Sequence, residues 1–366
     1  MYIEMFTEDS ILLRNHFLPR MTLKNSIELQ RIYDFFHTVN IHPINMKSLD
    51  TRDVEKTEIT VSRGAGADNI IEKSYLFAKT SFHFVLNRCN ITIHLFSKKT
   101  KKTLIHELAK VVQYVFSLSR NDLRHLVINI YLIDKKKTNT PGMKKLGRNE
   151  INSGMCQRGK VTTITIYREE ELIKVLIHEL IHGFQYDNYE DTDKIIKHYQ
   201  KKYHMSSKNI NTNEAYTEIW ANLINCYLIS QKPGRNNYNL FLILIALENN
   251  FSKYQAEKVM YLTDLDGKEN IDINKDTNVL SYFIIRNEIY EKLNLFLKFC
   301  RNHNDDYIKL NDEKEWFNFL MKIDKIKKNN RRFNNTDKQN YIFKTMRMSL
   351  NEVDIYAVEK TPSLLG

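Results

Sequence analysis

The stretch of sequence that decides the fold runs Leu-Ile-Lys-Val-Leu-Ile-His-Glu-Leu-Ile-His-Gly-Phe from residue 172 to residue 184. Its apolar residues predict a buried helix, opened by three glutamates at 169–171 whose charges suit the helix dipole. His178 and His182 are four residues apart and share one helix face, so both imidazoles can reach one metal ion. Glu179 points about 100° further round the helix axis, toward water on that ion. This pattern is typical of a zinc site with a carboxylate base.

A near-copy of the motif elsewhere in the chain allows an internal comparison. Leu-Ile-His-Glu-Leu occurs at 176–180 and again at 104–108, but Lys110 stands where the second copy needs its second histidine. Because a lysine cannot complete a pair of nitrogen ligands, we expect His106 to be an ordinary helix residue. A chance H-E-x-x-H is also conceivable in a chain with 12 histidines, so the true motif needs independent support.

That support is a second acidic motif, Asn-Glu-Ala-Tyr-Thr-Glu, at residues 213–218. A catalytic zinc ion bound by two histidines can take its third ligand from a carboxylate on a following helix, which leaves one position for water. Glu214 and Glu218 are one helical turn apart and share a face. One of them can bind the metal while the other holds a ligating histidine in one tautomer.

Together the two motifs resemble the gluzincin branch, the thermolysin-like group, of the zinc metallopeptidases. In that family H-E-x-x-H is followed by N-E-x-x-[ST]-[DE] on the next helix, and the resemblance spans roughly residues 91–230. It implies hydrolysis of a polypeptide substrate by a zinc-activated water. The residues it implies for Zn²⁺ are the ligands His178, His182 and Glu214, with Glu179 as general base and Glu218 as the acid that hydrogen-bonds a ligating histidine.

Other zinc families fit less well. A metzincin would need glycine and histidine where this chain has Gln185 and Asn188, and an inverted H-x-x-E-H motif is absent. More loosely, residues 152–171 resemble uncharacterised metallopeptidase-like proteins of large DNA viruses, which would make this a viral protein.

The remaining patterns predict an α+β fold with several parts. An amphipathic helix at 104–115, a strand at 126–133 and a strand at 161–167 precede the zinc helix. The resemblance implies a zincin-like core at 86–230, with a small mixed sheet whose edge strand, at 161–167, pairs with extended substrate. We expect an N-terminal region of uncertain fold at 1–85 and a mainly helical subdomain at 231–324. A basic, asparagine-rich linker, a short helix (338–351) and a tail would fill 325–366.

The oxyanion of peptide hydrolysis needs a donor besides the metal, such as a tyrosine from the C-terminal helices. Tyr282 is the first candidate, with Arg286 one turn further on. Tyrosines at helical spacing are more often core residues, and this chain has 20.

Composition limits the cellular context and the partners. Cys89, Cys156, Cys226 and Cys300 are far apart and predict reduced, mostly buried thiols. The start of the chain lacks a signal-peptide pattern and no apolar run reaches the length of a membrane span, so we expect a cytoplasmic protein, or one carried in a virus factory or virion.

The formal charge of +11 suits an acidic partner, and an acidic polypeptide substrate is one expectation. No recognised nucleic-acid module accompanies the short basic runs, which we interpret as solvated surface. Two alternatives to a peptidase stay open. One is a non-catalytic binding or structural protein on a zincin scaffold. The other is a basic nucleic-acid-associated protein in which the motif is incidental.

Overall fold

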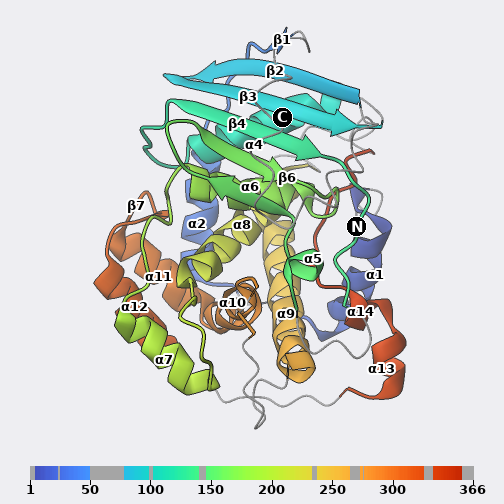
Figure 1. The fold of residues 1–366 in the computed structure, drawn as a ribbon, viewed down its shortest axis with the longest axis vertical. Helices are drawn as coiled ribbons and strands as arrows, with labels where there is room; N and C mark the ends of the chain where they lie inside the picture. The colour runs from blue at the N-terminus through green and yellow to red at the C-terminus, as the bar shows by residue number, and fades with distance from the viewer. Residues whose placement is uncertain are drawn as a thin grey trace.

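The computed structural model describes most of the chain, namely residues 5–23, 25–49, 78–98, 102–139, 146–232, 237–263, 273–274, 276–324 and 333–356. The basic run at 327–332 lies outside these residues. Within them, no helix combines the length and the apolar character that crossing a membrane would require. The fold is mixed α+β, as the sequence predicts (Figure 1).

A six-stranded mixed sheet lies across the top of Figure 1, in the strand order β1-β2-β3-β4-β6-β5. Strands β3, β4 and β6 are parallel, while β1–β2, β2–β3 and β5–β6 pair antiparallel. The bounds of the strands are β1 Lys47–Leu49, β2 Ala78–Leu86, β3 Cys89–Ser97, β4 His125–Tyr131, β5 Gly154–Gln157 and β6 Thr162–Ile166.

Along each strand, side chains point alternately to the two faces of the sheet, and one of these faces is apolar. A row of paired residues crosses this face and consists of Phe82, Ile93, Ile128, Ile164 and Cys156. Helices α4 (Lys102–Phe116) and α6 (Leu172–Gly183) pack against each other, and α6 also packs on β5 and β6. Strands β2 and β3 are joined by a turn at Asn87, whose positive φ of 53° suits a tight hairpin.

The expected edge strand needs correction. The strand predicted at 161–167 is β6, but it lies inside the sheet, and β5 forms the edge beside it. Four residues that begin with glycine are too short for an alternating pattern, so β5 escapes detection in the sequence. The edge strand is therefore Gly154–Gln157, which packs against the helix that carries the H-E-x-x-H motif.

Helices fill the space below the sheet. Helix α8 (Thr212–Gln231) packs against α6 and against α9 (Tyr238–Thr263). The other helices are α1 Glu8–Phe17, η2 Leu18–Arg20, α2 Ile27–His37, α5 Arg148–Ile151, α7 Asp193–Tyr203, the π-helix Leu280–Ile285, α10 Arg286–Glu291, α11 Leu293–His303 and α12 Glu313–Ile323. A two-stranded hairpin, β7 (Asn304–Asp305) with β8 (Lys309–Leu310), joins α11 to α12.

The boundary expected at the end of the N-terminal region interrupts a strand of the sheet. The boundary between residues 85 and 86 falls inside β2, so the sheet continues across it. One cluster of buried apolar residues extends from Met5 to Ile355 and includes the sheet, α6, α8 and the C-terminal helices.

The last part of the chain also differs from the helix predicted at 338–351. Two short helices, α13 (Asn335–Gln339) and α14 (Tyr341–Lys344), are followed by an extended, buried segment at 345–353. The carboxylates of Glu171 and Glu248 accept backbone N–H groups of this segment. Side-chain acceptors thus replace the helical hydrogen bonds.

Candidate metal centre

Helix α6 is buried on nearly all sides, because the sheet, α4 and α8 all pack against it. A helix that is apolar all round suits this position. His178 and Glu179 are each 5% exposed. The motif therefore lies in a region of low dielectric, where polar side chains need partners.

Helix α8 presents its N-terminal end to α6. The carboxylate of Asp191 accepts hydrogen bonds from the backbone N and the hydroxyl of Thr212, the first residue of α8, at 2.6 and 2.5 Å. This side chain satisfies a donor that the helix itself leaves unpaired. Glu214 lies in the first turn, where the positive end of the helix dipole favours a carboxylate.

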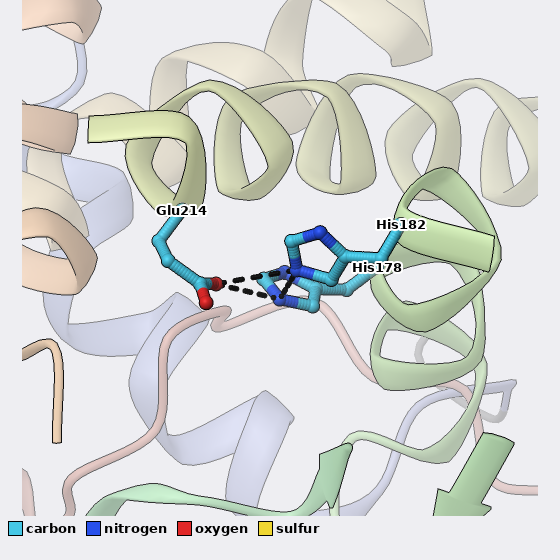
Figure 2. Close-up of side chains that lie close together, drawn as sticks. All are labelled: His178, His182 and Glu214. Carbon is cyan, nitrogen blue, oxygen red and sulfur yellow. Dashed lines mark hydrogen bonds and ion pairs between the residues drawn. The ribbon is translucent and has the colours of Figure 1, made fainter. Parts of the chain in front are cut away.

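Three candidate ligand atoms from these helices converge on one point. Figure 2 shows His178 and His182 projecting from α6 toward Glu214 on α8. The Nε2 atoms of the two histidines are 3.0 Å apart, and Oε2 of Glu214 lies 3.2 Å from one and 3.3 Å from the other. Among the described residues, these three side chains form the group that could hold a metal ion.

The electrostatics of this group favour a cation. Burial opposes ionisation of Glu214, but His182 and His178 outweigh it and hold the pKa of that carboxyl below its ordinary value. Against the opposing effect of burial, Asp187 and Glu214 raise the pKa of His182 well above its ordinary value. The negative charge that stabilises a proton on these nitrogens would also stabilise a cation, and a metal ion would compete with the proton for them.

Glu218 lies behind His178 and does not reach the point of convergence. Its Oε1 is 2.9 Å from Nδ1 of His178, a close polar contact on the side of the ring away from Glu214. Lys174 contacts both oxygens of Glu218, and Arg286 lies 3.5 Å from Oε2. Burial opposes ionisation, but Lys174 and His178 hold the pKa of Glu218 below its ordinary value.

His182 has a carboxylate partner of its own. Nδ1 of His182 is 2.5 Å from Oδ2 of Asp187, which is fully buried. The same oxygen accepts a hydrogen bond from the hydroxyl of Thr217 on α8, at 3.1 Å. Each histidine thus faces a buried carboxylate with Nδ1 and the shared point with Nε2. Carboxylates in this position fix the ring orientation of a ligating histidine.

Glu179 points toward the edge strand. A Cβ atom at Gly154, the first residue of β5, would lie 2.8 Å from Oε1 of Glu179 and 3.0 Å from a methyl group of Val175. Glycine at this position therefore leaves the space that the carboxylate occupies. Burial raises the pKa of Glu179 above its ordinary value, although both histidines oppose the shift. A raised pKa brings a carboxylate closer to the range of a general base at neutral pH.

A cavity of about 30 Å³ adjoins this carboxylate. The cavity is lined by residues of β5, α6, α8 and the C-terminal segment, among them Gly154, Val175, His178, Glu179, Tyr282 and Met348. Its volume suits a water molecule or a small group, and its polar side chains offer such a molecule partners.

The structure places Tyr282 beside this cavity, in the π-helix, with its ring centroid 6.2 Å from that of His178. Burial, reinforced by Glu214 and Glu179, raises its pKa well above the ordinary value, so the hydroxyl keeps its proton. The other suggested donor, Arg286, is fully buried, bound to Glu218 and to the carbonyl of Met348. Arg286 is therefore placed to hold Glu218 in position rather than to contact a substrate.

The near-copy of the motif at residues 104–108, here called the decoy motif, lies in α4 and has a different environment. His106 is exposed, and Leu104, Ile105 and Leu108 form the buried face of the helix. His106 takes no part in the group of candidate ligands.

Several residues around the site escape the sequence analysis. Lys174 is one turn before His178 on the same face, and a lone lysine in an apolar helix is a signal that could identify it. Asp187 follows the motif by a few residues, but no spacing rule assigns it to His182. Asn278, which donates to Oε1 of Glu214 at 3.2 Å, and Arg158 come from distant segments.

The four cysteines are free thiols, and three of them are buried, as the sequence predicts.

Comparisons of the chain with family models, with curated proteins and with solved structures find no match.

Proposed function

We propose that this chain is a zinc-dependent metallopeptidase of the gluzincin type. The observation that carries the proposal is the triangle formed by Nε2 of His178, Nε2 of His182 and Oε2 of Glu214, with edges of 3.0–3.3 Å. Tetrahedral zinc with bonds of about 2.0–2.1 Å requires donor atoms about 3.3 Å apart. The donor set, two neutral nitrogens and one carboxylate, also suits catalytic zinc with a fourth position for water.

A bound zinc ion would lower the pKa of its water from about 16 toward about 7. The role of Glu179 is to accept a proton from water at that position and to pass it to the departing amine of the peptide. Its burial, its raised pKa and its place beside the cavity support this role. Tyr282 would donate a hydrogen bond to the oxyanion that develops on the substrate carbonyl.

The position of edge strand β5 supports the proposal that the substrate is a polypeptide. It is the outermost strand on its side of the sheet, and its first residue touches Glu179. An extended peptide that pairs with such an edge gains backbone hydrogen bonds, whatever its side chains are. The scissile bond would then lie beside α6. A zincin-like arrangement, with an edge strand, a metal helix and a third-ligand helix, is the fold-level part of the same proposal.

The test is peptide hydrolysis by purified protein, with a library of peptides and mass-spectrometric readout. We expect cleavage that a chelator abolishes and zinc restores. Glu179→Gln should keep the metal but lose about 10²–10⁴-fold in rate, because it removes the general base.

The matched control is Glu107→Gln in the decoy motif, which should leave the rate unchanged. A wild-type chain that binds zinc but cleaves no peptide, and behaves like Glu179→Gln in every assay, would favour a non-catalytic binding protein. Steeply salt-dependent nucleic-acid binding without any metal would favour the other alternative, a basic nucleic-acid-associated protein.

A further inference from the structure

Arg158 directly follows edge strand β5, and its three guanidinium nitrogens bind the end of α6 and the segment after it. Nε donates to the backbone carbonyl of His182 at 2.8 Å, Nη1 to Oδ1 of Asn188 at 2.8 Å, and Nη2 to Oδ1 of Asp187 at 2.9 Å. The planar fork of arginine fits such a set of acceptors, which no lysine can match.

The contact with Asp187 differs from an ordinary surface ion pair. The side chain of Arg158 is 35% exposed, but that of Asp187 is 0% exposed. A buried carboxylate without a cation is costly, and Arg158 supplies the cation from the rim of the fold. The other oxygen of Asp187 lies 2.5 Å from Nδ1 of His182.

The guanidinium therefore holds His182 at two places. It binds the backbone carbonyl of that residue directly, and it binds the ring through Asp187. Thr217 donates to Asp187 from α8, one turn after Glu214, so the same carboxylate joins both helices that carry candidate ligands. A shift of Arg158 would change the angle at which His182 presents Nε2.

We propose that Arg158 is a positioning residue for the metal ligand His182, acting mainly through Asp187. The inference rests on the metal site proposed above. Because Arg158 directly follows β5, it connects the strand that would bind substrate to a metal ligand.

The test measures the affinity of the full-length protein for Zn²⁺ and Co²⁺ by competition with a chelator. The absorption bands of bound Co²⁺ report ligand geometry, which a purely structural role of Arg158 would not alter. We expect Arg158→Met to weaken both metals by about 10–100-fold, the usual cost of losing support for a ligand, and to shift the cobalt bands.

Two further variants sharpen the test. If Arg158 acts through Asp187, the effects of Arg158→Met and Asp187→Asn should be less than additive in the double variant. Arg301→Met is the matched control, because Arg301 is 33% exposed and pairs with Glu28 at 3.2 Å, away from all site residues. It should leave the metal affinity unchanged.

Arg158→Lys keeps the charge but not the fork, and we expect a smaller loss of affinity. It also serves as the measured variant should Arg158→Met fail to fold. Wild-type affinity and cobalt bands in the folded variants would overturn the inference while leaving the metal site intact. A wild-type protein that binds no metal would overturn the proposed function as well.

Discussion

Helices α4 and α6 pack side by side and share the sequence Leu-Ile-His-Glu-Leu, yet they differ in what surrounds it. In α4 the apolar residues face the core and His106 is exposed. In α6 a second helix covers the histidine side, so that His178 is 5% exposed and meets Glu214. The local motif therefore supplies at most two nitrogens, and the third candidate ligand comes from α8.

The largest difference between the two helices should appear when one histidine is removed from each. We expect His182→Ala to reduce bound zinc from about one ion per molecule to none and to abolish peptide hydrolysis, because two donors remain. His106→Ala should leave both quantities unchanged and alter the free energy of unfolding by less than about 0.5 kcal/mol. Metal analysis by mass spectrometry, with thermal unfolding, checks both. Equal zinc loss in the two variants would contradict the distinction.

A smaller effect should come from the edge strand, which approaches α6 at Gly154. Gly154→Ala places a methyl group within 2.8 Å of the Glu179 carboxylate, so the base must move while the ligands stay. We expect full zinc content and a loss of about 10²-fold in the rate of hydrolysis, the cost of a misplacement near 1 Å.

Gly159→Ala is the control for this substitution. Its Cβ would meet only a carbonyl oxygen of Val161 at 3.6 Å, an ordinary contact. It should leave the rate unchanged. A wild-type rate in Gly154→Ala as well would show that Glu179 does not depend on this contact.

The smallest effect should follow from completing the motif in α4. Lys110→His gives this helix its own H-E-x-x-H, but among the described residues no carboxylate joins the exposed His106 in a group of candidate ligands. We expect zinc content to stay at about one ion per molecule and stability to change by less than about 0.5 kcal/mol. A second bound zinc ion would show that the pentapeptide and one histidine suffice.

Much of the fold can be predicted from local patterns. Apolar periodicity identifies α4, β4, β6 and α6. Periodicity fails for β5, which is four residues long, and for the buried segment at 345–353. The conformation of that segment depends on Glu171 and Glu248, which lie far away in sequence.

The residues of the candidate site also fall into two groups, those that spacing in the sequence predicts and those that only tertiary packing brings together. Spacing alone places His178, Glu179 and His182, and it narrows the third ligand to Glu214 or Glu218. It cannot separate these two, because one turn of helix decides which carboxylate meets Nε2 and which meets Nδ1. Tertiary packing also brings Asp187 and Arg158 to His182, and Arg286 to Glu218. No pattern in one sequence encodes such contacts.

Zinc content of the purified wild type, beside Glu214→Ala and Glu218→Gln, tests the central claim most directly. The claim is that α8 completes the site through Glu214, and that Glu218 only supports His178. We predict about one zinc ion in the wild type, none in Glu214→Ala, and about 10–100-fold weaker binding in Glu218→Gln. A wild type without zinc, or a Glu214→Ala variant that binds it as tightly as the wild type, would contradict the claim.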